Sequence, residues 1–367
     1  MMSVQTRRGG IATGPIPDFE SVTWVEHVNT VTGGTITLPE RSRSLRHLLS
    51  ASTDVEPVGI LIADPDTGRH VAGYMTEEEI TGEGGSLSLP FRLDIGLIND
   101  VPAFPDPATP DTPWAVNSHW TRTDTAVACA TIFLNSHSGP ASHPDYRRFT
   151  QVSGQGSGPT VTFRARMEPS LEYIAEKVAG QAIIDTVITD QQTMVLEVRD
   201  PVARPNVVFS SELHTMHEWA YTNRQPAHNR WIAGGSGEGT ARLVATSALP
   251  PTFWPRARAT FLDRRQSDQA ATQAAADDAA TWDGPTVSIV ATDGPTARYN
   301  RDFLLGDLVN VDIAGARLQL PATAVATTID QAGVTRQITL GSANIAGRPD
   351  LDLRTALLRR FGLMEQP

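Results

Sequence analysis

Apolar and polar residues alternate over many short segments of this chain. In the clearest segment, which follows Gly306, the apolar residues Val309, Val311 and Ile313 are separated by single polar residues. This two-residue period is typical of a strand with one buried face, and a glycine beside an aspartate is typical of a tight turn before it. We take residues 282–313 as the centre of the chain's organisation. They carry no recognisable binding or catalytic motif, and we predict that they belong to a small β-barrel.

Several short strands are also predicted before residue 98. They are residues 21–28, 35–38, 58–62, 70–74 and 86–89. Gly33 and Gly34 are expected to interrupt the first strand run, so that residues 21–28 and 35–38 form a hairpin, and residues 64–68 have the composition of a tight turn between two strands. Strands of this length and spacing favour a small barrel or a sandwich.

The middle of the chain has a different pattern. Five prolines within residues 102–113 predict a linker or an extended loop. The apolar run at residues 126–134 fits a buried helix or a buried strand, and periodicity alone does not decide between them. Pro169 and Ser170 are expected to open a helix with Ser170 as its N-cap, and strands are expected at 194–198 and 207–209. This mixture predicts an α/β insertion.

The last third returns to strands and turns. A glycine-rich run at residues 234–239 lies between two apolar segments and predicts the tip of a hairpin. Ser267 is expected to cap an alanine-rich helix that extends to Thr281. Residues 325–329 and 334–340 predict a second hairpin, and residues 353–361 predict a terminal amphipathic helix.

These elements predict a β-rich α+β fold with two small β-barrels, an α/β insertion and a C-terminal helix. The predicted parts are a flexible arm at 1–17, a first barrel at 18–98 plus 203–248, the insertion at 99–202, a helix with a second barrel at 249–350, and a terminal helix at 351–367. The arm is expected because glycine and proline are frequent in its sequence.

Composition supports a globular, turn-rich protein. The 367 residues include 29 Gly and 26 Pro, and 40% of them are hydrophobic. The net charge of −11 argues against sequence-specific binding of nucleic acid, which needs dense Lys and Arg. An acidic wall would instead repel DNA and let it pass without sticking.

Cysteine usage and hydropathy indicate where the protein is made. Cys129 is the single cysteine, so an intrachain disulfide is excluded. No apolar run approaches the length that spans a bilayer, and residues 1–10 lack the apolar segment of a signal peptide. We therefore expect a protein that is made and kept in a reducing compartment, or released from it by lysis.

His214, His217 and Glu218 are the first candidates for chemistry. Two histidines three residues apart could share a zinc ion if the segment were helical. Their order differs from the metalloprotease motifs H-E-x-x-H and H-x-x-E-H, and no third ligand is evident nearby. We favour surface or interface histidines and expect no metal.

The glycine run at 234–239 also suggests a nucleotide-binding loop. It lacks the G-K-[ST] ending and lies between two predicted strands, so a hairpin tip is favoured. It is not a nucleophile elbow either, because Glu238 stands where the last glycine of G-x-S-x-G would be.

The remaining candidates are carboxylates, a thiol and histidines. Acidic runs at residues 77–79 and 277–278 could supply a glycosidase acid and base, although charge runs are more often solvated surface. Cys129 lies in an apolar run, which favours an inert thiol. His119, His137 and His143 form a loose group in a polar region and are a weak metal candidate. We expect no catalytic residue, cofactor or metal site.

Taken in order, the segments resemble a family of siphovirus minor tail proteins, the tail-tip hub proteins of tailed phages, often from actinobacterial hosts. The resemblance extends from Phe19 to Phe361. It rests on the Trp24 strand and residues 33–39, 71–74, 197–200, 208–210, 229–231, 264–265, 299–311 and 334–341. The sequence departs from the family pattern at 214–221 and at 100–160, where it is longer and richer in Pro and His.

The resemblance implies a homotrimeric hub, in which two similar barrels per chain give a pseudo-sixfold collar. Such a collar would adapt a sixfold tail tube to a threefold tip or fibre and surround the DNA channel. The implied partners are the distal tail protein, the tape measure protein and tip or fibre proteins. Two alternatives stay open, namely a cell-wall-degrading tail enzyme and a receptor- or polysaccharide-binding tip protein.

Overall fold

The computed structural model describes residues 2–8, 11–45, 48, 58–75, 81–83, 85–114, 116–188, 194–222, 227–249, 258–265, 268–280, 286–313 and 315–342. The chain forms two compact units. Unit 1 comprises residues 1–218, 289–341 and 356–367, and unit 2 comprises residues 219–288 and 342–355. Each unit is described by itself, and the domain boundaries expected from the sequence stay a prediction.

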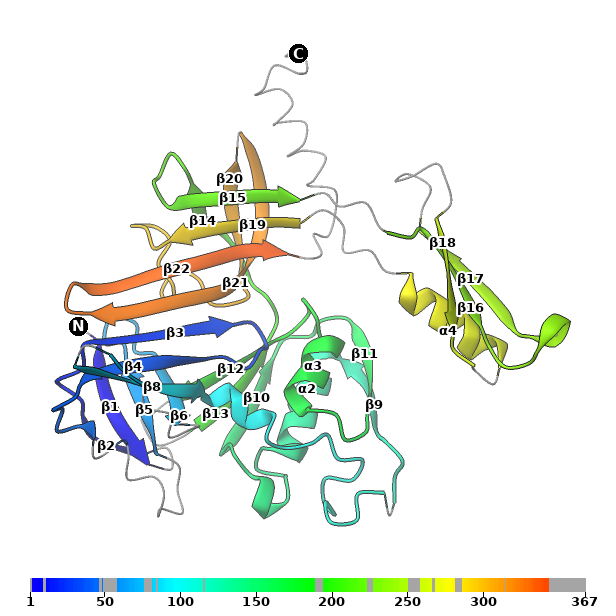
Figure 1. The fold of residues 1–367 in the computed structure, drawn as a ribbon, viewed down its shortest axis with the longest axis horizontal. Coiled ribbons are helices and arrows are strands. Elements are labelled where there is room, and N and C mark those ends of the chain that lie inside the picture. The colour runs from blue at the N-terminus through cyan, green and yellow to red at the C-terminus, as the bar shows by residue number, and fades with distance from the viewer. Residues whose placement is uncertain are drawn as a thin grey trace. The chain divides into compact units, whose positions relative to one another are not determined.

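A large, mainly antiparallel sheet dominates unit 1 (Figure 1). Its N-terminal strands are β1 (Ser3–Arg8), β2 (Ile11–Pro15), β3 (Ser21–His27), β4 (Gly33–Pro39), β5 (Val58–Ala63), β6 (His70–Met75), β7 (Thr81–Glu83) and β8 (Ser86–Leu93). They follow the order β3-β4-β8-β6-β5-β1-β2, with β7 paired to β8. The predicted turn at 64–68 joins β5 to β6, where the Gly68 N–H donates to the Asp64 carbonyl at 2.8 Å.

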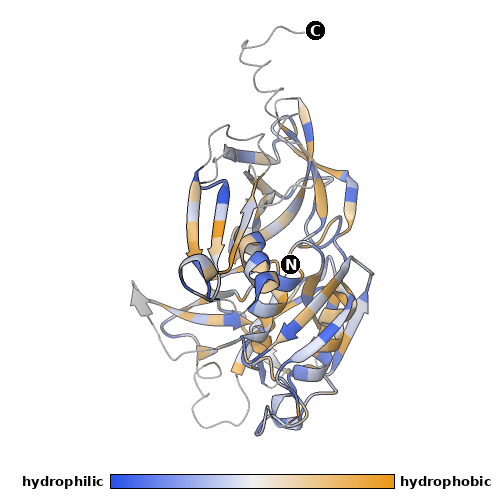
Figure 2. Cartoon of the chain, turned by 90° about the vertical axis from the view of Figure 1, so that its right-hand side faces the viewer, coloured by the Kyte–Doolittle hydropathy of each residue, from blue (hydrophilic) through white to orange (hydrophobic). Residues whose placement is uncertain are grey.

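The C-terminal strands extend the same sheet. They are β14 (Ala203–Ser210), β15 (Met216–Thr222), β19 (Thr286–Thr292), β20 (Leu308–Ile313), β21 (Ala316–Asp330) and β22 (Gly333–Ser342). Strand β21 pairs with β20, β22 and β3, so it joins segments about 300 residues apart, for example Thr328 with Thr23. Residues along β21 alternate between buried and more exposed positions, and hydrophobic positions alternate with polar ones along many strands (Figure 2).

The β-rich fold class is confirmed, while the two separate barrels stay a prediction. The main path of described strands begins at β15 and ends at β2, and β14 and β20 branch from β21. This path does not close on itself within the described residues. The predicted strands around 309–313 and the hairpin of β21 and β22 are both confirmed.

The first residues form strands, so the flexible arm expected at 1–17 is wrong. β1 pairs with β5 over six residues, from Ser3 opposite Ala63 to Arg8 opposite Val58, and β2 pairs with β1. Val4 and Ile16 are buried. The apolar side chains of this segment pack into the sheet, and this packing outweighs the local preference of its glycines and prolines for irregular structure.

The predicted hairpin of β3 and β4 is confirmed, but Gly33 and Gly34 lie inside β4 and do not interrupt the strand. β3 and β4 pair from Ser21 opposite Thr37 to Trp24 opposite Gly34, with the connection at residues 28–32. A Cβ on Gly34 would stand 2.2 Å from the Thr23 carbonyl oxygen and 2.6 Å from the Phe91 ring. The glycine is therefore needed for the close approach of a neighbouring strand.

An α/β region follows β8 and the short helix η2 (Asp94–Ile98). It contains β9 (Trp120–Thr125), α2 (Ala126–His137), η3 (Pro144–Tyr146), β10 (Gln151–Gln155), β11 (Thr160–Ala165), α3 (Ser170–Lys177), β12 (Ile183–Ile188) and β13 (Met194–Arg199). The ambiguous apolar run is thus the helix α2. Pro169 is the N-cap of α3, and Ser170 instead donates its hydroxyl to the Val101 carbonyl, which corrects the predicted cap.

Unit 2 is a three-stranded sheet with one helix. Its elements are β16 (Arg230–Gly234), η4 (Gly239–Ala241), β17 (Val244–Ala248), β18 (Ala259–Asp263) and α4 (Gln269–Ala279), and the strand order is β17-β16-β18. Asp268 caps α4 by accepting from the Ala271 N–H at 2.7 Å, so it takes the role expected of Ser267.

The helix expected at 353–361 lies outside the described residues. Of the described helices, none combines the length and apolar character needed to cross a bilayer.

Candidate functional site

Buried charges gather around the loop between β19 and β20 in unit 1. Two aromatic residues anchor this loop, because Tyr299 and Phe303 are each about 1% exposed. The Phe303 ring meets that of Phe209 edge-on, with centroids 5.7 Å apart. The polar residues between and beside them are thereby held against strands from three other parts of the chain.

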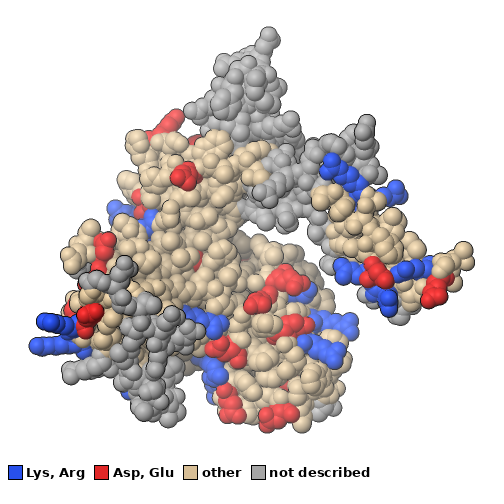
Figure 3. Space-filling view, in the orientation of Figure 1, with Lys and Arg blue, Asp and Glu red and all other residues tan. Residues whose placement is uncertain are grey.

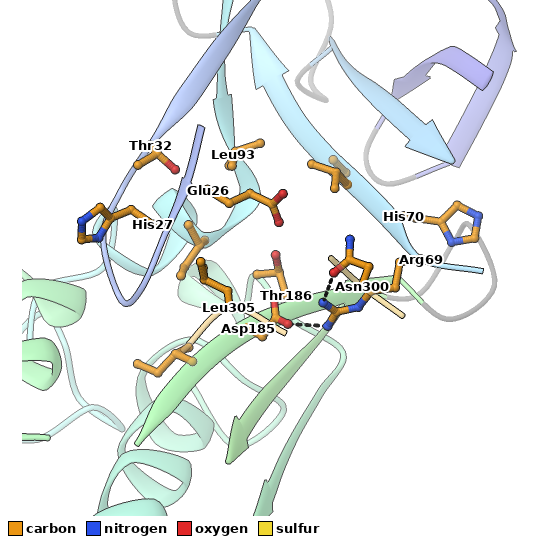
Figure 4. A pocket seen from close by; sticks show the side chains of 14 residues that line it. Glu26, His27, Thr32, Arg69, His70, Leu93, Asp185, Thr186, Asn300 and Leu305 are labelled. Carbon is orange, nitrogen blue, oxygen red and sulfur yellow. Dashed lines mark hydrogen bonds and ion pairs between the residues drawn. The ribbon is translucent and has the colours of Figure 1, made fainter. Parts of the chain in front are cut away.

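Arg69 forms the first contact of this loop with distant elements. Its guanidinium donates to the Asn300 side-chain oxygen at 3.0 Å and also binds the Asp185 carboxylate on β12 (Figure 4). Burial disfavours the charged guanidinium, but the charge and hydrogen bond of Asp185, together with Tyr299 and Glu26, outweigh this effect and raise the pKa of Arg69. The loop, the turn before β6 and the α/β region are thus joined at one point.

Glu26 on β3 faces the same pocket. Its carboxylate accepts from the Tyr299 hydroxyl and the Trp24 indole N–H, both at 3.2 Å. Burial, and then repulsion from Asp185, raises the pKa of the Glu26 carboxyl above its ordinary value. Burial, followed by the charge of Glu26, also raises the pKa of Tyr299. Tyr299 therefore stays a hydrogen-bond donor.

Arg336 on β22 binds the other side of the loop. It donates to Asp64 and to Asp293, each at 3.0 Å, and its side chain is 13% exposed. Asp293 also accepts from the Tyr299 backbone N–H at 3.0 Å. One arginine therefore joins the turn after β5, the start of the loop and the strand β22.

Asp307 fixes the end of the loop. It is fully buried and accepts from Arg199 at 2.6 Å and from Arg204 at 2.8 Å. The Leu304 backbone N–H donates to the same carboxylate at 3.1 Å, and Arg199 also donates to the Leu305 carbonyl. These charge-assisted bonds satisfy the buried carboxylate and hold the turn that the Gly306-Asp307 sequence predicts.

The cavities around these residues differ in size. The pocket lined by Glu26, Arg69 and Asp185 has a volume of about 40 Å³, which suits a few water molecules and no organic substrate. A second cavity of about 420 Å³ is lined by residues that include Asp64, Tyr299 and Arg336. Arg69 pairs with Asp185 in the first, and Arg336 pairs with Asp64 and Asp293 in the second. This arrangement is suited to holding chain segments in place.

The structure separates the candidate zinc residues. His214 lies in a turn with φ 54°, while His217 and Glu218 lie on the strand β15, so the helical spacing that metal binding requires does not occur. The His217 ring nitrogen Nε2 lies 3.2 Å from the Thr292 hydroxyl. No group of three or more possible metal-ligating side chains occurs among the described residues.

Cys129 and the three other histidines also have separate environments. Cys129 is buried in α2, and this burial raises the pKa of its thiol, as an inert thiol requires. His137 is buried at the end of α2, where its ring nitrogens lie 2.9 Å and 3.0 Å from two backbone carbonyls. His119 is half-buried in a loop, and His143 caps η3.

The glycine run and the acidic runs show no assembled site in the described part of the chain. Residues 234–239 connect the antiparallel strands β16 and β17, with Gly237 at φ 98°, so the hairpin tip is confirmed. Asp277 lies exposed on α4. Residues 77–79 and the Asp278 side chain lie outside the described residues.

Sequence reasoning missed the charge clusters around the loop. Asp293 and Asp307 were recognised as turn residues, but their arginine partners lie 43 and 108 residues away. A charged residue inside an otherwise half-apolar strand, such as Glu26 or Arg336, is the one local signal that could have indicated them.

Comparison with known proteins gives one family. The model of the Siphovirus ReqiPepy6 Gp37-like protein family matches residues 10–342. A search of curated proteins gives no match.

Solved structures with a similar fold include phage tail and baseplate proteins. The tail protein from Neisseria meningitidis MC58 matches with a TM-score of 0.53 and 15% identity, covering 93% of this chain and 96% of that one. The 43 kDa tail protein of prophage MuSo2 from Shewanella oneidensis gives 0.53 and 9%, covering 95% and 99%. A chain of the activated phage P2 baseplate gives 0.52 and 9%, covering 95% and 100%. The resemblance to a siphovirus tail family noted in the sequence is thereby confirmed, and the chain belongs to the Siphovirus ReqiPepy6 Gp37-like protein family.

Proposed function

We propose that this protein is the structural hub of a phage tail tip. Three copies would form a ring that adapts the sixfold tail tube to a threefold tip or fibre and surrounds the DNA channel. The observation that carries the proposal is that the family match and the fold similarity both extend over nearly the whole chain and, for the tail and baseplate structures, over nearly the whole of the other chain.

The charge clusters around the loop between β19 and β20 support a structural role. Arg69, Arg336 and Asp307 each join segments from distant parts of unit 1. A buried carboxylate or guanidinium with several fixed partners specifies one arrangement of the chain and penalises others. Such rigidity suits a ring that must keep its shape while other proteins bind to both of its sides.

Strand edges offer surfaces for assembly. The main path of the large sheet has end strands at β2 and β15, and an end strand presents backbone groups that another chain can pair with. Identical copies that associate through such edges form closed, symmetric rings when the rotation between them closes. Two barrel-like halves per chain would turn three copies into a pseudo-sixfold collar.

The net charge of −11 suits a passage for DNA, because an acidic wall repels the phosphate backbone. The partners we propose are two further copies of the chain, the distal tail protein, the tape measure protein and tip or fibre proteins. The location we propose is the tail tip of the virion, after synthesis in the host cytoplasm.

Gold-labelled antibody against the protein tests this assignment on intact virions by electron microscopy. We expect label at the distal end of the tail in wild-type particles and none on particles whose gene for this protein carries a stop codon. Label confined to the capsid, or intact infectious tails without the protein, would contradict the proposal.

A further inference from the structure

The sheet of unit 2 has two different faces. Strand register places Trp231, Ala233 and Ala245 on the face covered by α4, and all three are buried. The opposite face carries Val244 and Phe261, which are 49% and 54% exposed. Ile232 on the central strand β16 lies directly opposite Phe261 and is half-buried. This second face is an apolar surface without a covering element among the described residues.

Phe261 is held in place on this face, on the edge strand β18. Its ring lies over Gly234, where a Cβ would stand 2.6 Å from the ring. The Arg242 guanidinium lies 5.2 Å from the ring centroid and is fixed by Asp263 at 2.6 Å. An exposed aromatic side chain that is already ordered loses little conformational freedom on binding, which is typical of an interface anchor.

The side covered by α4 carries mostly small side chains in the described part of unit 2. Ala233, Ala245 and Ala276 form a buried cluster there, and Trp231 is also buried. The apolar side chains that stay exposed on the other face would add stability to the unit if they were covered.

Charge indicates what covers this face. Unit 2 holds 9 of the chain's 30 Lys and Arg and 8 of its 41 Asp and Glu, so its formal net charge is +1, while unit 1 has 21 and 33 and a charge of −12. Arg230 is exposed and shares its strand face with Ile232, and Arg264 is exposed directly after β18. Asp and Glu side chains lie over the α/β region of unit 1 with Lys and Arg between them (Figure 3). Residues 99–202 hold 12 Asp and Glu and 7 Lys and Arg, so this region has a formal net charge of −5, and Glu172 and Glu176 are exposed on it.

We propose that the Phe261 face of unit 2 docks on the acidic α/β region of a second copy of this chain. The inference rests on the proposed function, because it requires that copies associate. It adds to that function the surface through which one subunit binds the next. In this surface Phe261 makes the apolar contact, and the arginines beside it lie opposite carboxylates of the second copy.

Sedimentation over a concentration series tests the surface with matched variants. Phe261→Asp places a negative charge within the apolar face of unit 2. Thr240→Asp adds the same charge at the exposed hairpin tip of the same unit. We expect Phe261→Asp to raise the dissociation constant at least about tenfold, as loss of a buried aromatic anchor does, while Thr240→Asp leaves it unchanged. Added salt should weaken the wild-type association because exposed charges are screened.

Hydroxyl-radical footprinting of the wild-type chain gives a second measurement that does not depend on whether a variant folds. Phe261 should be oxidised in dilute monomer and protected in the assembled form. If the wild type assembles while Phe261 is oxidised equally in both states, or while Phe261→Asp assembles like the wild type, the docking surface is wrong and the hub proposal stands. A wild type that is monomeric at every concentration overturns both.

Discussion

Arg7 on β1 and Asp94 at the start of η2 form a buried bidentate ion pair across 87 residues of sequence. The Arg7 Nη1 donates to the Asp94 Oδ2 at 2.7 Å, and the second nitrogen binds the other carboxylate oxygen. The two side chains are 5% and 2% exposed. Arg7 also donates to the Gly73 carbonyl at 3.2 Å. The first strand is thereby fixed to the point where the chain leaves the sheet for the α/β region.

Replacing Arg7 by methionine should destabilise unit 1 by roughly 3–5 kcal/mol, because the Asp94 carboxylate would stay buried without its partner. Chemical denaturation measures the change in the free energy of unfolding. Arg317→Met is the matched control, since the Arg317 side chain is 62% exposed in its pair with Asp312 and its loss should cost less than about 1 kcal/mol. Equal effects of the two variants would contradict the structural role of Arg7.

The Asp307→Asn variant should also be strongly destabilising. It removes the negative charge that pairs with both Arg199 and Arg204, and it leaves these cations beside a neutral amide. We expect a loss of roughly 2–5 kcal/mol, with faster hydrogen exchange at the Leu304 amide, which donates to this carboxylate. Asp312→Asn, at a side chain 36% exposed, is the control. Unchanged exchange at Leu304 would show that Asp307 does not hold the loop.

Gly34→Ala tests the close approach of β3, β4 and β8. The added Cβ would meet the Thr23 carbonyl oxygen at 2.2 Å, so backbone must shift, and overpacking of this kind costs about 1–3 kcal/mol. Gly14→Ala in β2 has no atom within 4 Å of the new Cβ and should be nearly neutral. Thermal melting of both variants under one set of conditions makes the comparison, and equal melting temperatures would argue against the pairing of these strands.

Glu26→Gln should change how stability depends on pH. Burial and the charge of Asp185 raise the pKa of Glu26 above its ordinary value of 4.5. At a pH between the ordinary and the raised pKa, the folded chain therefore binds more protons than the unfolded chain. Its contribution to the free energy of unfolding is therefore complete below pH 4.5 and is lost as the pH rises through the raised pKa. Glutamine cannot ionise and should remove this loss.

Denaturation of the Glu26→Gln variant and the wild type across this pH range measures the effect as a difference. The variant should gain stability relative to the wild type as the pH rises. Glu176→Gln, at an exposed carboxylate, is the control and should show no such trend. A constant difference between Glu26→Gln and the wild type at all pH values would mean that the Glu26 environment does not disfavour its charge.

Local sequence pattern predicted the strands whose alternation is regular. The strand after Gly306 and the hairpin of β21 and β22 are examples, because each has one buried and one exposed face and a turn residue at its end. The pattern failed for β1 and β2, whose glycines and prolines suggested a flexible arm. The tertiary partners β5 and Asp94 decide the structure of that segment, and neither is visible in the local sequence.

The charge clusters could not be predicted from the local sequence either, because their members are far apart in the chain. Arg69 and Asp185 are 116 residues apart, and Arg336 and Asp64 are 272 apart. A turn sequence such as Asp64 to Gly68 predicts its own geometry through short-range bonds, but it says nothing about which strand will present an arginine to it. The metal pair considered at His214 and His217 depends on local structure. Their spacing brings the two rings together only on a helix, whereas the segment forms a turn and a strand.

The mass of the purified wild-type assembly in solution tests the central claim most directly. Light scattering coupled to size-exclusion chromatography should give three times the chain mass of 39.6 kDa at concentrations where the protein assembles, with no stable dimer. A particle of one or two chains at every concentration reached would contradict a threefold hub.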